Sequence, residues 1–563
     1  MRNISVGCVT HHAHIRVRMR HILRACNVNC VDAHHICVTH HAHHTRARAA
    51  TDGTLRISFN AFCALHGRIL SLYALWGAYF HTKKDSCIME ILEQIDSLVW
   101  GPAMILLLLG SHLYLTIRTR FIQRKLPSAI RMSLINDTSE SAGKGDISHF
   151  GALATALAAT VGTGSIVGVA TAILSGGPGA IFWMWITGIF GIATKYTEVF
   201  IAIKYRVIDA HGTMLGGAMY AWDRAFKKDG KTPWYAKFFA IVFSIFAAIA
   251  ALGIGNAVQS NAMTGIITAH SGIPAWIAGL IIAALAAVVV IGGVKSISRV
   301  CEFLVPIMAV GYALGCFIIL AMNAEFIIPA FQEIILCAFT PRAAFGGAVG
   351  SGIMVALQYG CARGLFSNES GLGSSAIIAA AAQTKNPAQQ ALVAMTGAFW
   401  STVVICLLTG IVIVSTLLAH PDAVSYVAGH PTLSGTDLAN LAFQHVPFVG
   451  GPILALGIIA FSFSTILGWY YYGNRAAAYL FGSKGIRIYQ VLYVLATFFG
   501  AIGVGNVVWT ISDITNALMA IPNIIVTLLL SGIVARETKH YVYQHHMDEE
   551  SNDPIPTITS VQS

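Results

Sequence analysis

The sequence predicts an all-α polytopic membrane protein with eleven transmembrane helices: one extra N-terminal helix, then an inverted 5+5 repeat with two broken helices. Three observations lead to this prediction. Of the 563 residues, 56% are hydrophobic and only 11% are charged, whereas a soluble globular domain carries about 25% charged residues. Eleven apolar runs are each long enough to cross a bilayer core of about 30 Å. Two of these runs, five spans apart, are interrupted by glycine and polar residues. A soluble enzyme is therefore excluded.

Residues 1–88 form an atypical, low-complexity extension rich in His, Cys and Arg. They contain 12 of the 22 His and 6 of the 11 Cys, and the run Cys8-Val-Thr-His-His-Ala-His14 returns as Cys37-Val-Thr-His-His-Ala-His43. Cys26-x3-Cys30 lacks the second ligand pair that a closed zinc site needs. The amphipathic stretch that leads into the first span starts at Met89. Whether the extension is part of the native protein therefore stays open.

The formal charge of +10 does not indicate a nucleic-acid partner. Residues 1–88 hold 11 Lys or Arg against 3 acidic residues, so the rest of the chain has 24 basic and 22 acidic side chains. A nearly balanced chain offers no basic surface for a phosphate backbone. The remaining partners expected are a lipid bilayer and a small molecule, and no obligate protein partner is evident.

The predicted spans make up a membrane domain at residues 89–536, followed by a tail at 537–563 that we expect to be disordered and cytoplasmic. Repeat one covers about 148–322 and repeat two about 345–534. Lys and Arg gather in the loops after odd-numbered spans, whereas the loop at 419–447 contains none. The positive-inside rule then places the N-terminus of the core outside and the C-terminus in the cytoplasm. The spans lie near residues 98–118, 149–174, 179–203, 236–265, 272–293, 302–322, 345–381, 388–418, 448–475, 487–506 and 509–534.

Two spans are predicted to be broken helices. The second reads Ala158-Ala-Thr-Val-Gly-Thr-Gly-Ser-Ile-Val-Gly168, and the seventh reads Arg363-Gly-Leu-Phe-Ser-Asn-Glu-Ser-Gly-Leu-Gly-Ser374. Unwound backbone is tolerated at membrane depth only where protein or a watery cavity satisfies it. The second break comes five spans after the first, and an odd offset makes the second set of helices run opposite to the first. Secondary transporters use this arrangement to bind substrate at the midplane.

Ionisable residues inside the spans need partners. A carboxylate at the centre of a helix costs about 2.5 to 3.5 kcal/mol on insertion scales, so we expect Glu369 to be paired or to face a cavity. Arg363 is its nearest candidate partner in the sequence. Lys195 and Glu198, three residues apart in span 3, are interpreted as a structural ion pair.

Six motifs within the spans together carry a family resemblance: Gly176-Gly-Pro-Gly-Ala-Ile-Phe-Trp-Met-Trp185, Gly162-Thr-Gly-Ser165, Gly255-Asn-Ala-Val-Gln-Ser260, Gly364-Leu-Phe-Ser-Asn-Glu369, Phe463-Ser-Thr-Ile-Leu-Gly-Trp469 and Met519-Ala-Ile-Pro-Asn523. They resemble the alanine or glycine:cation symporter family, also described as the sodium:alanine symporter family. The resemblance covers about residues 89–540 and implies the fold of the bacterial leucine transporter, with one extra helix at the start. Members carry small neutral amino acids, usually with sodium.

The substrate site follows from the breaks and from this resemblance. Main-chain N–H groups at the start of a half-helix bind a carboxylate, which points to the first break. Gln259 and Asn256 are three apart in span 4 and share a helical face, so both are expected to look into one cavity, unless they bond to a neighbouring helix. Phe366 and Trp469 would cover a small side chain. The expected substrate-binding residues are Thr160, Thr163, Gly164, Gly168, Gln259, Phe366, Thr465 and Trp469.

The resemblance also implies a sodium site between spans 2 and 9. Sodium is a hard cation that prefers oxygen ligands, and the expected ligands are Ala158, Val161, Phe461, Ser464 and Thr465. The alternative for the two hydroxyls is a bond to their own helix carbonyls. Three positions depart from the family pattern: Ser165 replaces an asparagine, Ser401 an aspartate and Asn474 a glutamate. We hypothesise from these losses that one cation is used, which a measured stoichiometry of two would overturn.

Together these features predict a secondary active symporter, not an enzyme, that moves alanine or glycine with sodium by alternating access in a bacterial plasma (inner) membrane. Three alternatives stay open. Uptake that responds to pH but not to sodium would indicate proton coupling, with Glu369 as the carrier. Binding without transport would indicate a sensor. A conductance far above transporter turnover would indicate a channel.

Overall fold

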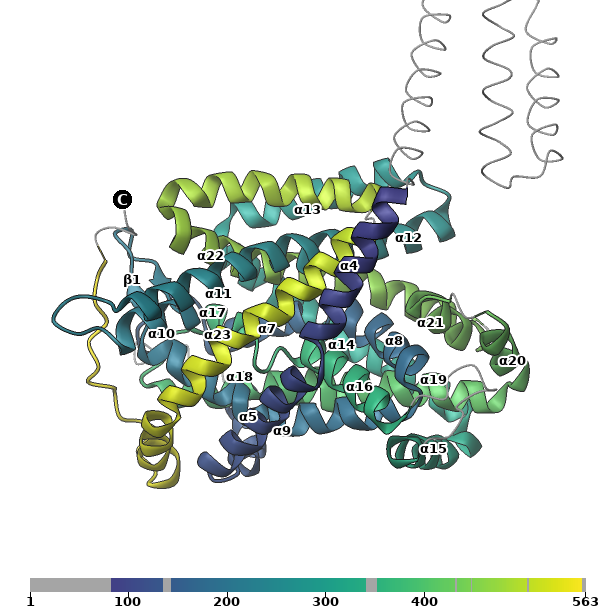
Figure 1. The fold of residues 1–563 in the computed structure, drawn as a ribbon, viewed down its shortest axis with the longest axis horizontal. Coiled ribbons are helices and arrows are strands. Elements are labelled where there is room, and N and C mark those ends of the chain that lie inside the picture. The colour runs from purple at the N-terminus through teal and green to yellow at the C-terminus, as the bar shows by residue number, and fades with distance from the viewer. Residues whose placement is uncertain are drawn as a thin grey trace, which may run out of the picture. The chain divides into compact units, whose positions relative to one another are not determined.

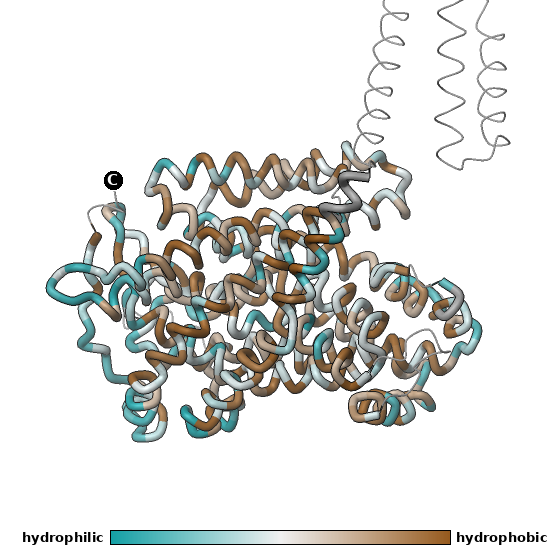
Figure 2. The backbone as a smooth tube through the Cα atoms, viewed as in Figure 1, coloured by the Kyte–Doolittle hydropathy of each residue, from teal (hydrophilic) through white to brown (hydrophobic). Residues whose placement is uncertain are grey.

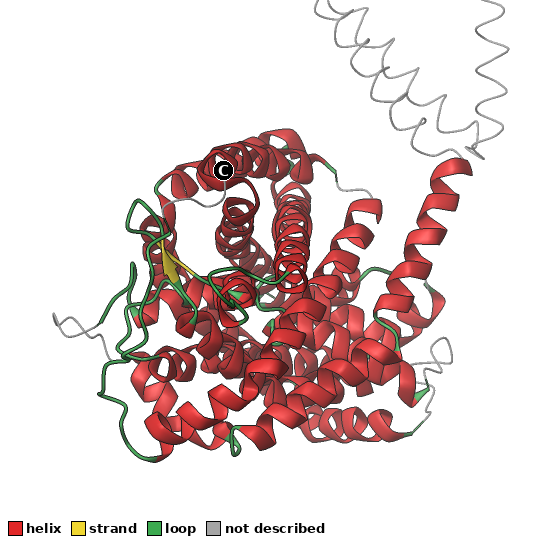
Figure 3. Ribbon diagram, turned by 60° about the vertical axis from the view of Figure 1, so that its left-hand side comes forward, coloured by secondary structure: helices red, strands yellow, loops and turns green. Residues whose placement is uncertain are grey.

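The part of the chain that the structure describes is helical apart from one small hairpin and the connecting loops (Figures 1 and 3). Strand β1 (Val207–Ile208) pairs antiparallel with β2 (Met214–Leu215). The all-α prediction is therefore confirmed. The computed structural model describes residues 83–134, 143–340, 352–430, 433–446, 448–503 and 506–558. The low-complexity extension lies outside these residues, except where α4 begins at Lys83.

The first half of the membrane domain contains the first broken helix, α7 and α8. Local sequence explains where α7 begins, because Ser148 caps it by accepting a hydrogen bond from the N–H of Gly151. The elements are α4 (Lys83–Val99), α5 (Pro102–Arg118), η1 (Ile122–Lys125), α6 (Leu126–Leu134), α7 (His149–Thr160), η2 (Thr163–Ser165), α8 (Val167–Gly176), α9 (Gly179–Lys204), α10 (Ala218–Ala225), α11 (Trp234–Leu252), η3 (Gly253–Ala257), α12 (Val258–Ser271), α13 (Ala275–Ile291) and α14 (Gly293–Met322).

The second half contains the other broken helix, α16 and α17. Asn386 caps α18 and is followed by Pro387 at the first helical position, a favourable start for a helix. The elements are η4 (Ala324–Phe326), α15 (Ile327–Phe339), α16 (Ile353–Asn368), α17 (Ser374–Ala379), α18 (Pro387–Ala398), η5 (Phe399–Cys406), α19 (Leu407–Ala419), α20 (Pro421–Gly429), α21 (Gly435–Gln444), α22 (Gly450–Ile502), α23 (Asn506–Thr538) and η6 (Lys539–Tyr543).

Seven helices of the described chain are long and apolar enough to cross a membrane. The difference from eleven has identifiable causes. Both broken spans consist of short pieces, α13 has only 17 residues, and α22 merges two predicted spans across a kink at Gly482. The protein is a multi-pass membrane protein, whereas the number of crossings stays a prediction.

Large apolar side chains cover much of the outer surface. Phe303, Leu106, Ile291 and Phe499 are each more than 60% exposed, and hydrophobic segments run along the outer helices (Figure 2). A soluble monomer rarely exposes apolar surface on this scale. These faces therefore fit contact with lipid tails.

The two broken helices lie in the packed interior. Helix α7 packs against α14 and α22, and α16 packs along α9 and α8. The backbone at both interruptions is buried among these helices, so neighbouring elements can satisfy it.

The C-terminal segment differs from the expectation. The sequence predicted disorder from Glu537, but α23 continues to Thr538, η6 follows, and residues 544–558 lie against other parts of the chain. The N–H of Ile208 donates to Pro556 O (3.0 Å), and the N–H of Ile558 donates to Ile208 O (2.8 Å). The polar composition suggested disorder because it offers no apolar surface to bury, whereas main-chain hydrogen bonds to β1 hold the segment.

Candidate functional site

The first break lies between α7 and α8. Helix α7 ends at Thr160, the backbone of Val161 and Gly162 leaves the helical conformation, and η2 leads into α8. Both Val161 and Thr163 are almost fully buried. The prediction of a broken helix here is confirmed, and buried peptide groups are available at its centre.

Oxygen atoms from the break and from α22 lie close together. The Thr465 hydroxyl donates to the carbonyl of Ala158 at 2.9 Å. The Ser464 hydroxyl lies 3.3 Å from the same carbonyl and 2.9 Å from the carbonyl of Phe461. Four of the five predicted sodium ligands therefore meet in one cluster, which we call the oxygen cluster: Ala158 O, Phe461 O, Ser464 Oγ and Thr465 Oγ1.

The chemistry of the oxygen cluster fits a hard monovalent cation. Its donors are neutral carbonyl and hydroxyl oxygens, and all four residues are at most 2% exposed. Oxygen donors suit hard cations, whereas soft metals prefer sulfur or imidazole. The alternative of bonding within one helix holds in part for Ser464 and fails for Thr465, whose hydroxyl reaches across to α7.

The expected substrate residues surround the same break. The N–H of Thr163 donates to Gln259 Oε1 at 3.2 Å. A Cβ placed on Gly162 would lie 2.4 Å from the Thr465 hydroxyl, and one on Gly164 would lie 2.4 Å from the Phe366 ring. Side chains from α12, α16 and α22 thus contact the unwound segment directly.

Trp469 lies one turn farther along α22. Its indole N–H donates to the carbonyl of Ala159 at 3.3 Å, and a Cβ on Gly255 would collide with its ring. The ring is 3% exposed. Trp469 therefore packs between α7 and η3, beside the oxygen cluster.

Two expected substrate residues, Thr160 and Gly168, have no described side-chain contact with the oxygen cluster. The hydroxyl of Thr160 donates to Ala156 O and Leu157 O of its own helix. Gly168 lies on α8 with open space where a Cβ would be. A side-chain contact from Thr160 to the cluster is therefore absent from the described hydrogen bonds.

Asn256 and Gln259 do not look into one cavity as expected. Asn256 donates to the carbonyl of Tyr493 at 2.7 Å and accepts from the Thr497 hydroxyl at 2.8 Å, so it bonds to α22 instead. The physical reason is the π-helical turn η3, which contains Asn256 and changes the register before α12. The alternative of an interhelical hydrogen bond is the correct one for Asn256.

The second break lies between α16 and α17. Glu369, Gly371 and Gly373 all have positive φ, so the chain turns sharply before α17. The side-chain amide of Asn523 on α23 donates to the carbonyl of Gly371 at 2.9 Å. The ammonium of Lys195 on α9 donates to the carbonyl of Asn368 at 2.8 Å. Helices α9 and α23 therefore satisfy the unwound backbone.

The partner expected for Glu369 is wrong. Arg363 lies 3.3 Å from Asp513 on α23. Glu369 accepts from the Ser374 hydroxyl at 2.7 Å and interacts electrostatically with Lys195. The turn at Glu369 directs its side chain away from α16, so sequence proximity to Arg363 is no guide.

Lys195 also interacts electrostatically with Glu198, but a direct ion pair between them is not among the described contacts, so the structural pair stays a prediction. Glu198 accepts a hydrogen bond from Asn523 at 2.5 Å. The motif that contains Asn523 does not by itself predict that this side chain bridges α9 to the second break. The signal was its position after Pro522 inside an apolar span, where a polar side chain needs a partner.

The three positions that depart from the family pattern are buried. Ser165 and Ser401 are fully buried, and the Ser401 hydroxyl lies 3.4 Å from that of Thr402. Thr402 in turn donates to Ser367 at the second break. Asn474 instead donates to the Tyr470 hydroxyl, and its described hydrogen bonds do not include Ser401, Thr402 or Ser367.

The fold of this chain matches that of a solved structure. The crystal structure of MhsT in complex with L-phenylalanine aligns with a TM-score of 0.51 at 14% identity, covering 72% of this chain and 95% of that one. This match shows a leucine-transporter-like fold, and both breaks are buried within it.

The chain belongs to the sodium:alanine symporter family, whose model matches residues 85–554. It is 46% identical over 455 residues to the sodium/alanine symporter AgcS of Methanococcus maripaludis, covering 80% of this chain and 97% of that protein. It is also 34% identical over 473 residues to the probable sodium/glutamine symporter GlnT of Bacillus subtilis, covering 83% and 93%. The family resemblance seen in the sequence is confirmed.

Proposed function

We propose that this chain carries a small neutral amino acid, alanine or glycine, into the cell together with sodium by alternating access. The observation that supports this most is the oxygen cluster beside the first break, where Ala158 of α7 meets Ser464 and Thr465 of α22. Sodium-coupled relatives and the neutral oxygen donors agree with this coupling ion. One cation held there joins two helices that must move relative to each other.

The amino-acid carboxylate would bind at the main-chain N–H groups of Thr163 and Gly164. The N-terminal end of a half-helix favours an anion, so no arginine is needed. Gln259 Oε1 already accepts from the N–H of Thr163. We infer that this amide oxygen occupies the position that a substrate carboxylate oxygen takes on binding.

A small substrate is favoured by the packing around the break. The Phe366 ring lies so near Gly164 that no Cβ fits between them, and Trp469 is 3% exposed. None of the proposed substrate residues is ionisable, which suits a zwitterion without net charge. These features favour alanine or glycine over a longer substrate such as glutamine.

The proposed cycle uses sodium as a co-transported substrate. Cation and amino acid enter from one side, the two repeats rock, and both leave on the other side. One charge moved through 100 mV supplies about 2.3 kcal/mol, enough to concentrate a neutral substrate about 50-fold. We propose a bacterial plasma membrane as the location, with the C-terminus in the cytoplasm, because basic loops follow the odd-numbered spans.

The test is uptake of labelled alanine and glycine into proteoliposomes under a sodium gradient, a proton gradient or neither. We expect accumulation only with sodium, competition by unlabelled alanine or glycine, and weak competition by glutamine. Thr465→Ala should raise the sodium concentration that is needed for half-maximal uptake. Accumulation driven by a proton gradient alone would overturn sodium coupling, and binding without accumulation would indicate a sensor.

A further inference from the structure

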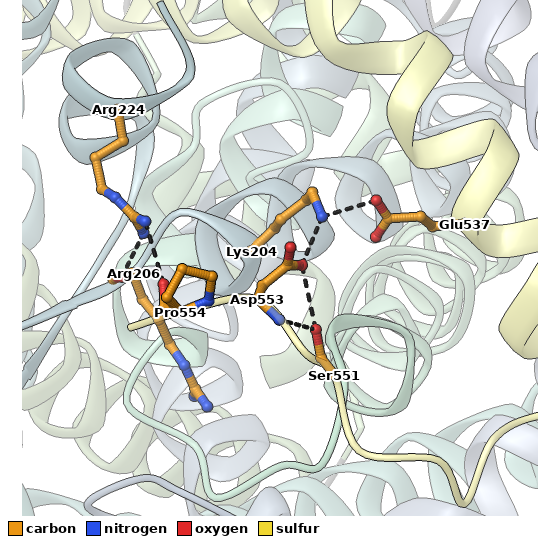
Figure 4. A network of polar contacts seen from close by, with 7 residues as sticks. All are labelled: Lys204, Arg206, Arg224, Glu537, Ser551, Asp553 and Pro554. Atoms are coloured by element: carbon orange, nitrogen blue, oxygen red, sulfur yellow. Dashed lines mark hydrogen bonds and ion pairs between the residues drawn. The ribbon is translucent and has the colours of Figure 1, made fainter. Parts of the chain in front are cut away.

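The segment after α23 lies against the C-terminal ends of α9 and α10. Lys204, at the end of α9, lies 2.7 Å from Glu537 and 2.6 Å from Asp553 (Figure 4). The Arg224 guanidinium donates to the carbonyl of Pro554 at 3.2 Å. Helices α9 and α10 therefore hold the segment at Asp553 and Pro554.

The near part of the segment covers the start of α18. The amide of Asn386 donates to the carbonyls of Met547 (2.8 Å) and Glu549 (3.0 Å), and Gln389 donates to Met547 O at 2.9 Å. Asn386 is also the N-cap of α18. The turn at residues 544–549 is thus fixed through its main chain, which leaves its side chains free for another use.

Two side chains of this turn, His546 and Glu549, converge with His540 of η6. His540 Nε2 lies 3.0 Å from Glu549 Oε2, and His546 Nδ1 lies 2.6 Å from Glu549 Oε1. The two imidazole rings stack with centroids 4.5 Å apart. One ligand atom from each residue lies within 4.8 Å of the others.

Two imidazoles and one carboxylate form the donor set of a zinc-type cation, because hard cations such as Mg²⁺ prefer oxygen ligands alone. Bonds of about 2.0 to 2.2 Å in tetrahedral geometry put ligand atoms roughly 3.3 Å apart. The observed separations of 2.6 and 3.0 Å, each to a different carboxylate oxygen of Glu549, need to widen by about 0.7 and 0.3 Å to reach this geometry. All three side chains are about half exposed, so they can make this adjustment and a cation can reach them.

We propose that His540, His546 and Glu549 bind a divalent cation of the zinc type, with water in the fourth position. His540 belongs to η6 at the end of α23, whereas Glu549 lies in the turn bonded to the start of α18. The bound cation therefore cross-links the last helix to the segment that covers α18, and it stabilises that segment in its present position. This proposal is independent of which substrate the transporter carries.

The test is amide hydrogen exchange of residues 537–558, measured by mass spectrometry on the full chain in nanodiscs with zinc chloride, magnesium chloride or EDTA. A local measurement is needed because the twelve His of residues 1–88 can also bind zinc. At free zinc a hundredfold above the dissociation constant, exchange through opening of this turn should slow about 100-fold. Magnesium should leave it unchanged.

The variants His546→Ala and Glu549→Gln should lose the protection by zinc. Glu549→Gln keeps the main-chain contact with Asn386 but loses the charge that faces His540 and His546, so the zinc effect of each variant is measured against that variant's own exchange in EDTA. His545→Asn is the matched control: this neighbour is not one of the three ligands, and its positive φ suits asparagine. No zinc effect in the wild type, or an equal effect in all variants, would overturn the proposal.

Discussion

Removing the hydroxyl of Thr465 tests the oxygen cluster most directly. In Thr465→Val the side chain keeps its shape, but the buried donor 2.9 Å from the Ala158 carbonyl is lost. Because Ser464 Oγ still lies 3.3 Å from that carbonyl, we expect the protein to fold. A bound cation, however, would lose one of its oxygen ligands.

The expected loss can be estimated from the burial of this site. Removing one partner of a buried polar interaction costs about 1 to 3 kcal/mol, and each 1.4 kcal/mol is a factor of ten in affinity. Since Thr465 is only 2% exposed, water does not easily replace the hydroxyl. The sodium concentration for half-maximal uptake should therefore rise about 5- to 150-fold.

The assay is sodium-dependent uptake of labelled alanine into proteoliposomes, with sodium-dependent thermal stabilisation of the purified protein as a second measurement. Thr197→Val is the matched control, because the Thr197 hydroxyl is equally buried and bonds only to Ala193 O of its own helix in the described contacts. A half-saturating sodium concentration within twofold of the wild type in Thr465→Val would refute the placement of the cation at this cluster.

Three further substitutions test other parts of the structure. Gly164→Ala should reduce alanine uptake at least tenfold, since its Cβ would collide with Phe366, whereas Gly168→Ala has open space and should keep it; equal uptake by the two variants would contradict this geometry. Asn523→Ala should lower the free energy of unfolding by about 2 to 4 kcal/mol, because two buried acceptors lose their donor; unchanged denaturation in detergent would show that Asn523 does not support the second break. Lys204→Gln should speed protease cleavage within residues 544–558, because the variant lacks the two ion pairs of Lys204. The difference in cleavage rate between variant and wild type should shrink at high salt, which screens those ion pairs in the wild type; cleavage of the variant at the wild-type rate would contradict their role.

The sequence predicted the features that depend on local composition. Gly162 and Gly164 within one apolar run, and Ser367 to Gly373 within another, contradict a continuous membrane helix, and the structure breaks both helices at those residues. Four of the five expected sodium ligands also lie together, and that expectation came from the family resemblance and not from local composition.

The hydrogen-bond and charge partners of the buried polar residues could not be predicted in the same way. Asn256 and Gln259 were expected on one helical face, but a π-helical turn separates them. Glu369 lies near Lys195 instead of Arg363, because a left-handed residue turns the chain at that point. Such changes of register and direction depend on packing between helices distant in the sequence.

That this chain spans a membrane with two interrupted helices follows from its residue order alone, because apolar length and glycine position act locally. Which polar side chains satisfy those interruptions, and that residues 547–549 lie against the start of α18, became known only from the packed structure. The physical reason is that a buried polar group needs a hydrogen-bond partner, and the fold decides which partners lie close enough, whatever their separation in the sequence.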